Sequence, residues 1–308
     1  MAATPPIVLT IAGFDPSSGA GITADIKVIA AHECYGIACP TALTVQSTRG
    51  VRRVQGVDPK IVAESLAELT SDFVLDAVHV GMLGNGQVAL AVADFLAQTR
   101  PPHVVLDPIL KSSSGADLLD PAGTRIMIER LFPLAELVTP NLEEAIALTG
   151  MTVKQAPERG AAGASVEASS TGSSVAALQA MREAARRLHS FGAANVVVTG
   201  GHLEKAIDLL SFTTTRGVEQ EIFKAQRQRS TSTHGTGCAF STALACHLAH
   251  GRGLPEAVLL SKAYVSAAIA NALPLGHGTG PLHHLYRMNQ QPRRAAAVAE
   301  TETAHSRN

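Results

Sequence analysis

The 308-residue sequence has no tryptophan, and all aromatic residues together make up only 4% of it. Hydrophobic residues nevertheless account for 46% of the chain, so its core must be built from Ala, Val, Leu and Ile. Such a core is typical of α/β proteins, whose central strands are rich in β-branched side chains. The length would suit two average domains, but a single α/β domain with a large sheet can also contain it.

A strong net charge is also missing, because 25 basic side chains oppose 26 acidic ones and leave a net charge of −1. A balanced chain provides no field that would gather nucleic acid or an anionic membrane, so we expect a small-molecule partner and neither of these. The longest mostly apolar stretch, residues 257–275, contains Ser261, Lys262, Ser266 and Asn271. These interruptions indicate a packed helix of a soluble protein rather than a membrane span.

Cysteine is scarce, and the four cysteines form no CxxC pair and have no histidines at zinc-finger spacing. This pattern argues against a structural metal site. The apolar run near the N-terminus has no Lys or Arg before it, so it is typical of a first strand rather than of a signal peptide. We therefore expect free thiols in a reducing cytoplasm. Cys34, Cys39 and Cys246 are assigned to the core, whereas Cys238 belongs to a motif discussed below.

Two common phosphate-binding motifs are absent as well. The sequence contains neither GxxxxGKS nor GxxxxGKT, which excludes a P-loop, and it has no GxGxxG between a first strand and its helix. The similar string GHGTG at 276–280 follows a helical stretch, which is the wrong context for a dinucleotide site. A nicotinamide-dependent enzyme is therefore disfavoured.

Short runs of β-branched residues alternate with helical stretches along the chain. Runs that are apolar on both faces and separated by helices predict a mainly parallel sheet covered on both sides, which is an α/β fold. Several runs end in Gly, Asp, Thr or Asn, and open α/β sheets build ligand sites at the carboxyl ends of their strands. The predicted strands are 7–13, 77–81, 103–107, 137–141 and 195–201, with an edge hairpin of 206–214 and 218–225; the predicted helices are 21–33, 58–70, 86–98, 141–149, 175–190, 236–250 and 255–272.

Two segments lack this periodicity. Residues 155–174 are small and polar, and we expect a flexible surface insertion there. A similar composition in 290–308 predicts a disordered tail. No internal repeat is present, so we expect residues 1–289 to form a single domain.

The string STHGTGCAFSTALA at 232–245 places two glycines and several hydroxyls directly before an Ala-rich helix. The amides of Gly235, Thr236, Gly237 and Cys238 can then surround a negative charge at the positive end of the helix dipole, which predicts an anion site. Amides of this kind contribute on the order of 10²–10³ in rate each. The dipole would also lower the pKa of Cys238 from about 8.5, so that its thiolate could act as a base. The motif alone is equally compatible with a tight loop before a small buried cysteine.

Further motifs occur in order along the chain: GFDPSSGAGITADIK (13–27), TALTVQSTRGV (41–51), VGML (80–83), LDPIL (106–110), TPNLEEA (139–145), GGH (200–202), HGTGC (234–238) and GTGPLHH (278–284). With them the sequence, from about Ile7 to Tyr286, resembles the hydroxymethylpyrimidine/phosphomethylpyrimidine kinases of thiamine biosynthesis. These belong to the ribokinase-like superfamily. The resemblance implies a three-layer α/β/α sandwich with a mainly parallel central sheet, ATP and Mg²⁺ as cofactors, and a homodimer.

The resemblance also implies a reaction. ATP would phosphorylate the hydroxymethyl oxygen of 4-amino-5-hydroxymethyl-2-methylpyrimidine, and the same site would then convert the monophosphate to the diphosphate. Cys238 stands where most of the superfamily has an aspartate base. Some pyridoxal kinases share this cysteine, which makes a pyridoxal kinase the closest alternative. A non-catalytic nucleotide sensor and a thiol-based acyltransferase are two further alternatives.

For the pyrimidine, the resemblance assigns Gln46 to hydrogen bonds with the ring. A carboxamide suits this task because it donates and accepts together. Gly13, Asp15, Ala20 and Met82 would shape the same pocket. Without the family, Gln46 would be an ordinary polar residue at a strand end, and Met82 would fill the core.

For magnesium, the resemblance assigns Asn141 and Glu144 to the ion and its waters, and Asn141 also to the nucleotide. Their spacing alone predicts a capping box at the start of a helix. Asp107, at the end of a predicted strand, would be a further acid near the metal. From the sequence alone it is equally well a turn residue before Pro108.

The nucleotide phosphates would lie near Thr199 and Gly201. The family commonly has Lys directly before GGH, where this chain has Thr199, so a phosphate-neutralising charge is missing there. Three explanations stay open: the Thr199 hydroxyl binds phosphate, or Lys111 or Lys262 supplies the charge, or turnover is slower.

Overall fold

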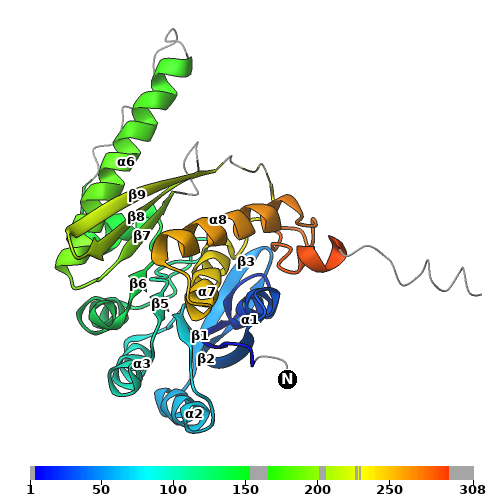
Figure 1. Cartoon of the computed structure of the whole chain (residues 1–308). Coiled ribbons are helices and arrows are strands. Elements are labelled where there is room, and N and C mark those ends of the chain that lie inside the picture. Colours follow the sequence, from blue (N-terminus) through cyan, green and yellow to red (C-terminus); the bar gives the residue numbers. More distant parts are fainter. Residues whose placement is uncertain (1–3, 153–165, 201–205, 226–227, 229, 291–308) are drawn as a thin grey trace, which may run out of the picture.

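A mixed sheet runs through the centre of the molecule (Figure 1). The computed structural model describes residues 4–152, 166–200, 206–225, 228 and 230–290, and within them the sheet has nine strands in the order β3-β2-β1-β4-β5-β6-β7-β8-β9. The six strands from β2 to β7 in this order are parallel, whereas β3, β8 and β9 are antiparallel to their neighbours. The strands are β1 (Ile7–Phe14), β2 (Tyr35–Ser47), β3 (Gly50–Gly56), β4 (Ala77–Val80), β5 (Val104–Leu106), β6 (Leu137–Val138), β7 (Val196–Gly200), β8 (Ala206–Thr214) and β9 (Gly217–Ala225).

Helices cover both faces of the sheet, so the molecule has three layers (Figure 1). One layer consists of α1 (Gly21–Ala31), α7 (Thr236–Ala249) and α8 (Leu254–Ala270). The other contains α2 (Pro59–Asp72), α3 (Gly86–Thr99), α4 (Pro121–Ile126), α5 (Leu142–Thr149) and α6 (Val166–Ser190). The predicted α/β/α sandwich is therefore confirmed. None of the helices in the described part of the chain is long and apolar enough to cross a membrane.

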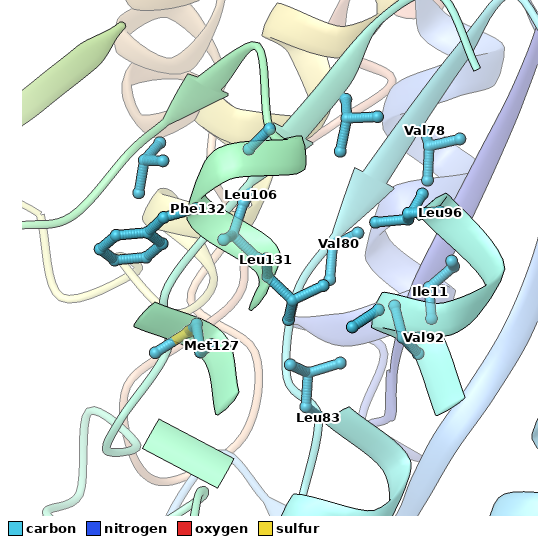
Figure 2. Packing of buried hydrophobic residues seen from close by; sticks show 14 of the residues in the cluster. Ile11, Val78, Val80, Leu83, Val92, Leu96, Leu106, Met127, Leu131 and Phe132 are labelled. Carbon is cyan, nitrogen blue, oxygen red and sulfur yellow. The ribbon is translucent and has the colours of Figure 1, made fainter. Parts of the chain in front are cut away.

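Buried, mostly aliphatic side chains fill the space between the sheet and α3 with the helical turns after α4 (Figure 2), and the same cluster extends to α2 and α6. Val80 of β4 and Leu106 of β5 belong to one buried cluster with Leu96 of α3 and with Leu131, in the short helical turn after α4. Branched aliphatic side chains of this kind fill a core without any tryptophan. Truncating a single buried leucine to alanine lowers the free energy of unfolding by about 2–5 kcal/mol. Close packing of this cluster therefore stabilises the arrangement of the layers.

The sequence pattern predicts most elements correctly. All five predicted strands, the edge hairpin and the predicted helices are present. The pattern misses β2 and β3, which form an antiparallel ribbon at the sheet edge. Alternate side chains of β2 are exposed, and Gly36 and Pro40 interrupt its β-branched residues, so β2 lacks the doubly buried signature of the inner strands.

The helix expected at 175–190 begins earlier, at Val166. The predicted insertion at 155–174 is thereby divided, because its residues up to 165 lie outside the described residues and 166–174 belong to α6. Of the predicted tail at 290–308, everything from residue 291 onward also lies outside the described residues.

The parallel strands bring polar residues from distant parts of the chain to one edge of the sheet. Asp15 follows β1, Met82 follows β4, Asp107 follows β5 and Asn141 follows β6. Thr199, near the end of β7, pairs with Asn141 through an isolated bridge. The fold therefore places the candidate residues where α/β sheets hold their ligands.

Candidate active site

A cavity of about 1070 Å³ lies at this edge of the sheet. Small-molecule sites occupy roughly 300–1,000 Å³, so the cavity has room for two ligands side by side. Gly201 lies outside the described residues. Every other predicted site residue lines the cavity: Gly13, Asp15, Ala20, Gln46, Met82, Asp107, Asn141, Glu144, Thr199, Gly235, Thr236, Gly237 and Cys238.

The first turn of α7 supplies backbone amides at this cavity. Gly235 is the N-cap, with φ of 80°, so the position has no side chain that could occupy the amides. A Cβ there would lie 2.0 Å from the carbonyl oxygen of Gly19, and a Cβ at Gly19 would lie 2.2 Å from the ring of His234. Both positions therefore require glycine. The free N–H groups of a first helical turn, here at Gly237 and Cys238, are a ready anion site.

Cys238 is a free cysteine on this turn; the residue is partly exposed, but its sulfur is desolvated. The sequence predicts that the helix dipole lowers its pKa, and the structure corrects this expectation. Burial raises the pKa of Cys238 well above its usual range, and the charges of Asp107 and Asp25 raise it further. A helix terminus carries only about half a charge, so it does not offset burial next to two carboxylates. The thiol of the ligand-free protein is therefore protonated at neutral pH.

Gln46 lies beside a histidine and a carboxylate. Nε2 of His234 is 2.9 Å from Oδ2 of Asp15 and 3.1 Å from the amide nitrogen of Gln46. A single ring nitrogen cannot donate to Asp15 and also accept from Gln46. The Gln46 amide therefore keeps donor capacity for a ligand, while its Oε1 accepts from the hydroxyl of Thr44 at 3.1 Å.

Asp15 holds the surrounding loop in place. Its carboxylate accepts from the amides of Ser17 and Ala20 at 2.8 and 3.0 Å and from the hydroxyl of Ser17 at 2.7 Å. Burial alone would raise the pKa of Asp15, but hydrogen bonds from His234 and Ser17 outweigh burial and lower it. A Cβ at Gly13 would lie 2.8 Å from the sulfur of Met82, so these two residues form a close wall.

Asn141 and Glu144 form the predicted capping box at the start of α5. Oδ1 of Asn141 accepts from the Glu144 amide at 2.8 Å, and Oε2 of Glu144 accepts from the Asn141 amide at 2.9 Å. Burial and the charge of Asp107 raise the pKa of Glu144 to about 8, and burial raises that of Asp107 to about 6.

This donor set fits a magnesium ion. Since burial raises the pKa of both carboxyl groups and the charge of Asp107 raises that of Glu144 further, a cation beside them would stabilise their ionised forms. The described residues contain no cluster of three or more His, Cys, Asp or Glu side chains suited to hold a metal. Magnesium does not need such a cage, because it keeps waters and takes phosphate oxygens in addition to one or two carboxylates.

Two lysines also line the cavity. Nζ of Lys262 is 2.5 Å from Oδ2 of Asp208, and both side chains are about nine-tenths buried. Lys111 is 3.5 Å from Asp117, and its side chain is 66% exposed. Asp208 is the partner of Thr199 in the β7–β8 ladder. Asp208 therefore holds the Lys262 ammonium near Thr199, the position at which the related kinases commonly have lysine.

Sequence reasoning misses several polar residues at the site. His234 stands within the HGTGC motif, yet only the fold brings it to Asp15 and Gln46, which are 219 and 188 positions away. Asp25, His79 and Ser241 are buried below the first turn of α7. Their spacing along the chain carries no signal that could have identified them.

A sequence model of the family described as phosphomethylpyrimidine kinase matches residues 15–173 and 165–283. The chain is 42% identical over 280 residues to the thiamine biosynthesis bifunctional protein ThiED of Geobacter sulfurreducens, covering 90% of this chain and 52% of that protein. It therefore spans about half the length of that relative. It is 39% identical over 282 residues to the hydroxymethylpyrimidine/phosphomethylpyrimidine kinase of Escherichia coli K12, covering 90% of this chain and 97% of that one.

Solved structures give the same picture of the fold. The chain is similar to an ADP complex of Bacillus subtilis pyridoxal kinase, with a TM-score of 0.76 and 31% sequence identity. The match covers 93% of this chain and 100% of that one. The predicted ribokinase-like type of α/β/α sandwich is therefore confirmed.

Proposed function

The chain belongs to the phosphomethylpyrimidine kinase family, and we propose that it phosphorylates 4-amino-5-hydroxymethyl-2-methylpyrimidine and then the resulting monophosphate. In each step ATP gives up its γ-phosphoryl group, first to the hydroxymethyl oxygen and then to a phosphate oxygen. The observation that carries this proposal is that one cavity is lined both by the Gln46, His234 and Asp15 side chains and by the first-turn amides of α7.

The pyrimidine binds at the Gln46 end of the cavity. Gln46 donates to and accepts from the polar edge of the ring, because the hydrogen bond between His234 and Asp15 leaves its amide free. Ala20 belongs to the loop that Asp15 holds, and Gly13 and Met82 form the apolar wall. Orientation of the hydroxymethyl group toward α7 then makes the transfer effectively unimolecular.

The phosphoryl group passes in front of α7. The amides of Gly235, Gly237 and Cys238 stabilise its negative charge, whereas the Thr236 amide donates to the carbonyl oxygen of Thr233 at 3.4 Å. The thiolate form of Cys238 accepts the proton of the hydroxyl group. Since the thiol is protonated in the ligand-free protein, the thiolate has to arise in the complex with both substrates.

The nucleotide binds beside Thr199 and Asn141. Asn141, Glu144 and Asp107 would hold magnesium and its waters, and the bound ion would neutralise phosphate charge. Lys262, oriented by Asp208, supplies the positive charge that is missing at Thr199, because its ammonium is buried at the cavity beside the Thr199 strand, whereas Lys111 is largely exposed to solvent.

We further propose that the protein acts in the cytoplasm as a homodimer. The location rests on its free thiols, and the homodimer rests on the family resemblance. Light scattering after size-exclusion chromatography tests the dimer, which predicts twice the 32.0 kDa mass of the chain.

Acceptor profiling with ATP and Mg²⁺ tests the proposed function. The purified protein should release ADP with the hydroxymethylpyrimidine and with its monophosphate, and mass spectrometry should detect the diphosphate. A higher kcat/KM with pyridoxal would instead identify a pyridoxal kinase, the alternative that the similarity to the Bacillus subtilis enzyme favours. ATP binding without ADP release would indicate a nucleotide sensor, and a covalent acyl adduct of the protein would indicate an acyltransferase.

A further inference from the structure

A chain of buried polar side chains lies beneath the first turn of α7, and the proposed reaction gives it no role. Asp25 of α1, His79 of β4 and Ser241 of α7 are fully buried, and Asp107 is only 5% exposed. Burying an imidazole between two carboxylates destabilises a fold unless all the groups are hydrogen-bonded. The hydrogen bonds of this cluster therefore have to be followed atom by atom.

On the Asp25 side, two hydroxyls face Nδ1 of His79. Thr10 donates to Oδ2 of Asp25 at 2.7 Å, and Thr242 donates to Oδ1 at 2.9 Å. The same hydroxyl oxygens lie 3.2 and 3.3 Å from Nδ1. Each hydroxyl has one hydrogen and has given it to Asp25, so each can only accept from His79. Nδ1 of His79 therefore carries a proton.

On the other side, Nε2 of His79 lies 3.0 Å from the hydroxyl of Ser241. The remaining neighbours of this hydroxyl are acceptors: Oδ2 of Asp107 at 3.2 Å and the carbonyl oxygens of Gly237 and Cys238 at 3.1 Å each. The hydroxyl has one hydrogen, which it can give to Nε2 or to one of these oxygens; the charged Asp107 oxygen is the stronger acceptor, and in that arrangement Ser241 accepts from Nε2. Both nitrogens of His79 are then donors, which is the imidazolium form.

The electrostatic surroundings agree with this assignment. Burial would lower the pKa of His79, but the charge of Asp25 outweighs burial and raises it. The imidazolium also lies between two of the carboxylates that raise the pKa of Cys238. Its positive charge therefore offsets negative charge directly below the place where the phosphoryl group passes.

We propose that His79 is a positioning residue: its imidazolium, held by Asp25, fixes Ser241, and Ser241 fixes both the Asp107 carboxylate and the first turn of α7. The inference rests on the proposed kinase function, because that turn carries the anion site and Cys238. His79 and Asp25 form part of the cavity floor, but the imidazole is fully buried and bonded to Ser241, so His79 acts on the transition state through Ser241, Asp107 and the first turn of α7. Its loss should therefore lower kcat and leave the KM values for ATP and for the acceptor unchanged.

Charge-keeping and charge-removing variants test this inference. H79Q should lower kcat by about 10- to 100-fold, the usual effect of losing a partner behind a catalytic group. H79K, which keeps the positive charge and can donate to both Asp25 and Ser241, should retain most of the wild-type kcat. H103Q is the matched control. His103 also contacts a carboxylate, that of Glu136 at 2.6 Å, but it lies at the end of β5 opposite to Asp107. H103Q should therefore keep wild-type kinetics.

The variant S241A separates positioning from folding. It removes one hydroxyl from a helix and leaves the contacts of His79 with Asp25, Thr10 and Thr242 in place. Because Nε2 of His79 loses its partner, S241A should lower the melting temperature by a few degrees, and kcat measured well below that temperature, where the variant is fully folded, should fall as in H79Q. Wild-type kcat in S241A or H79Q would overturn the proposal, and so would an H79K variant that is folded but as slow as H79Q.

A spectroscopic measurement needs no substrate. In protein with ¹⁵N-labelled histidine, both ring nitrogens of His79 should be protonated at pH 7, with the resonances assigned by their absence in H79K. A neutral tautomer would overturn the inference even if the kinase activity is confirmed. The kinetic comparison uses whichever acceptor the wild type phosphorylates, pyrimidine or pyridoxal, so failure of the proposed substrate is distinguished from failure of this proposal.

Discussion

Cys238 lies where two opposing electrostatic influences meet. The N-terminus of α7 favours its thiolate, but burial and the nearby carboxylates Asp107 and Asp25 favour the thiol, and they dominate in the ligand-free protein. Reactivity of this sulfur therefore depends on the charge that the substrates bring, and the dipole alone does not provide it. The thiol should accordingly be slow to react with alkylating reagents in the free protein.

Replacing Cys238 tests its role as a base. C238A should reduce kcat by at least about 10²-fold, because a positioned general base contributes about 10²–10⁴ in rate. The anion-site amides stay in place, so the affinity for ADP measured by calorimetry should change little. Wild-type kcat in C238A would remove Cys238 as the base and leave only its backbone amide in the mechanism.

At the scale of an element, the start of α5 combines a helix cap with a proposed metal site. The capping box would tolerate Gln in place of Glu144, because an amide oxygen accepts the same hydrogen bond. The carboxylate is unfavourable for folding, since burial and Asp107 raise its pKa from 4.5 to about 8. A carboxylate at position 144 is explained if its charge serves ligand binding, since functional sites often lower the stability of the fold.

This loss of stability predicts a pH dependence for E144Q. Between the unfolded pKa of 4.5 and the folded pKa of about 8, Glu144 is ionised in the unfolded state but still neutral in the folded state, so the wild type loses stability as the pH rises through this window. E144Q cannot ionise, so it does not suffer this loss. Its free energy of unfolding should equal that of the wild type near pH 4.5 and exceed it by a few kcal/mol at pH 8, on the order of 1.4 kcal/mol per unit of pKa shift. Urea unfolding in EDTA measures this difference. A gain that does not change with pH would contradict the prediction.

The ion pair between α8 and β8 leads to a prediction about the missing lysine. Replacing both partners, as in K262M combined with D208N, avoids leaving one buried charge unpaired. This double variant should raise the KM for ATP by about tenfold, the effect of a lost charged contact of about 1.4 kcal/mol. Adding T199K should restore much of the affinity, whereas K111M should have little effect. An unchanged KM in the double variant would exclude Lys262 as the phosphate-neutralising group.

At the scale of the whole molecule, the cavity is assembled by elements from both halves of the chain. The end that we propose for the pyrimidine is formed by β1, β2 and the HGTGC loop, and the end proposed for the nucleotide is formed by β6, β7 and α8. Ligands that bind across these elements should stabilise the entire fold, because they bind the folded state only.

Thermal unfolding with ligands tests this view and the substrate assignment together. An acceptor at 100 times its dissociation constant adds about 2.7 kcal/mol to the free energy of unfolding. At equal concentration, the hydroxymethylpyrimidine should therefore raise the melting temperature more than pyridoxal does. The same ranking is expected in C238A, which separates binding from turnover. A larger shift with pyridoxal would favour the pyridoxal kinase alternative.

Much of the fold follows from the sequence because inner parallel strands are buried on both faces and so appear as continuous apolar runs. The edge ribbon of β2 and β3 lacks this signature, since water covers alternate side chains of β2. The residues of the candidate site likewise fall into those that the sequence indicates and those that only the fold brings together. Motifs identify Gln46, the amides from Gly235 to Cys238, and Asn141 with Glu144, whereas His234 could be placed beside Asp15 only in three dimensions.

The sequence by itself determines the α/β class, the order of most elements, the family and the position of the proposed anion site before α7. These properties follow from local pattern, because strand burial, helix starts and glycine turns are all encoded within a few residues. Only the tertiary structure decides the protonation of Cys238 and the hydrogen bonds of His79. Charge and burial depend on distance in space, and the carboxylates of Asp25 and Asp107 reach both groups from strands and helices far away in the sequence.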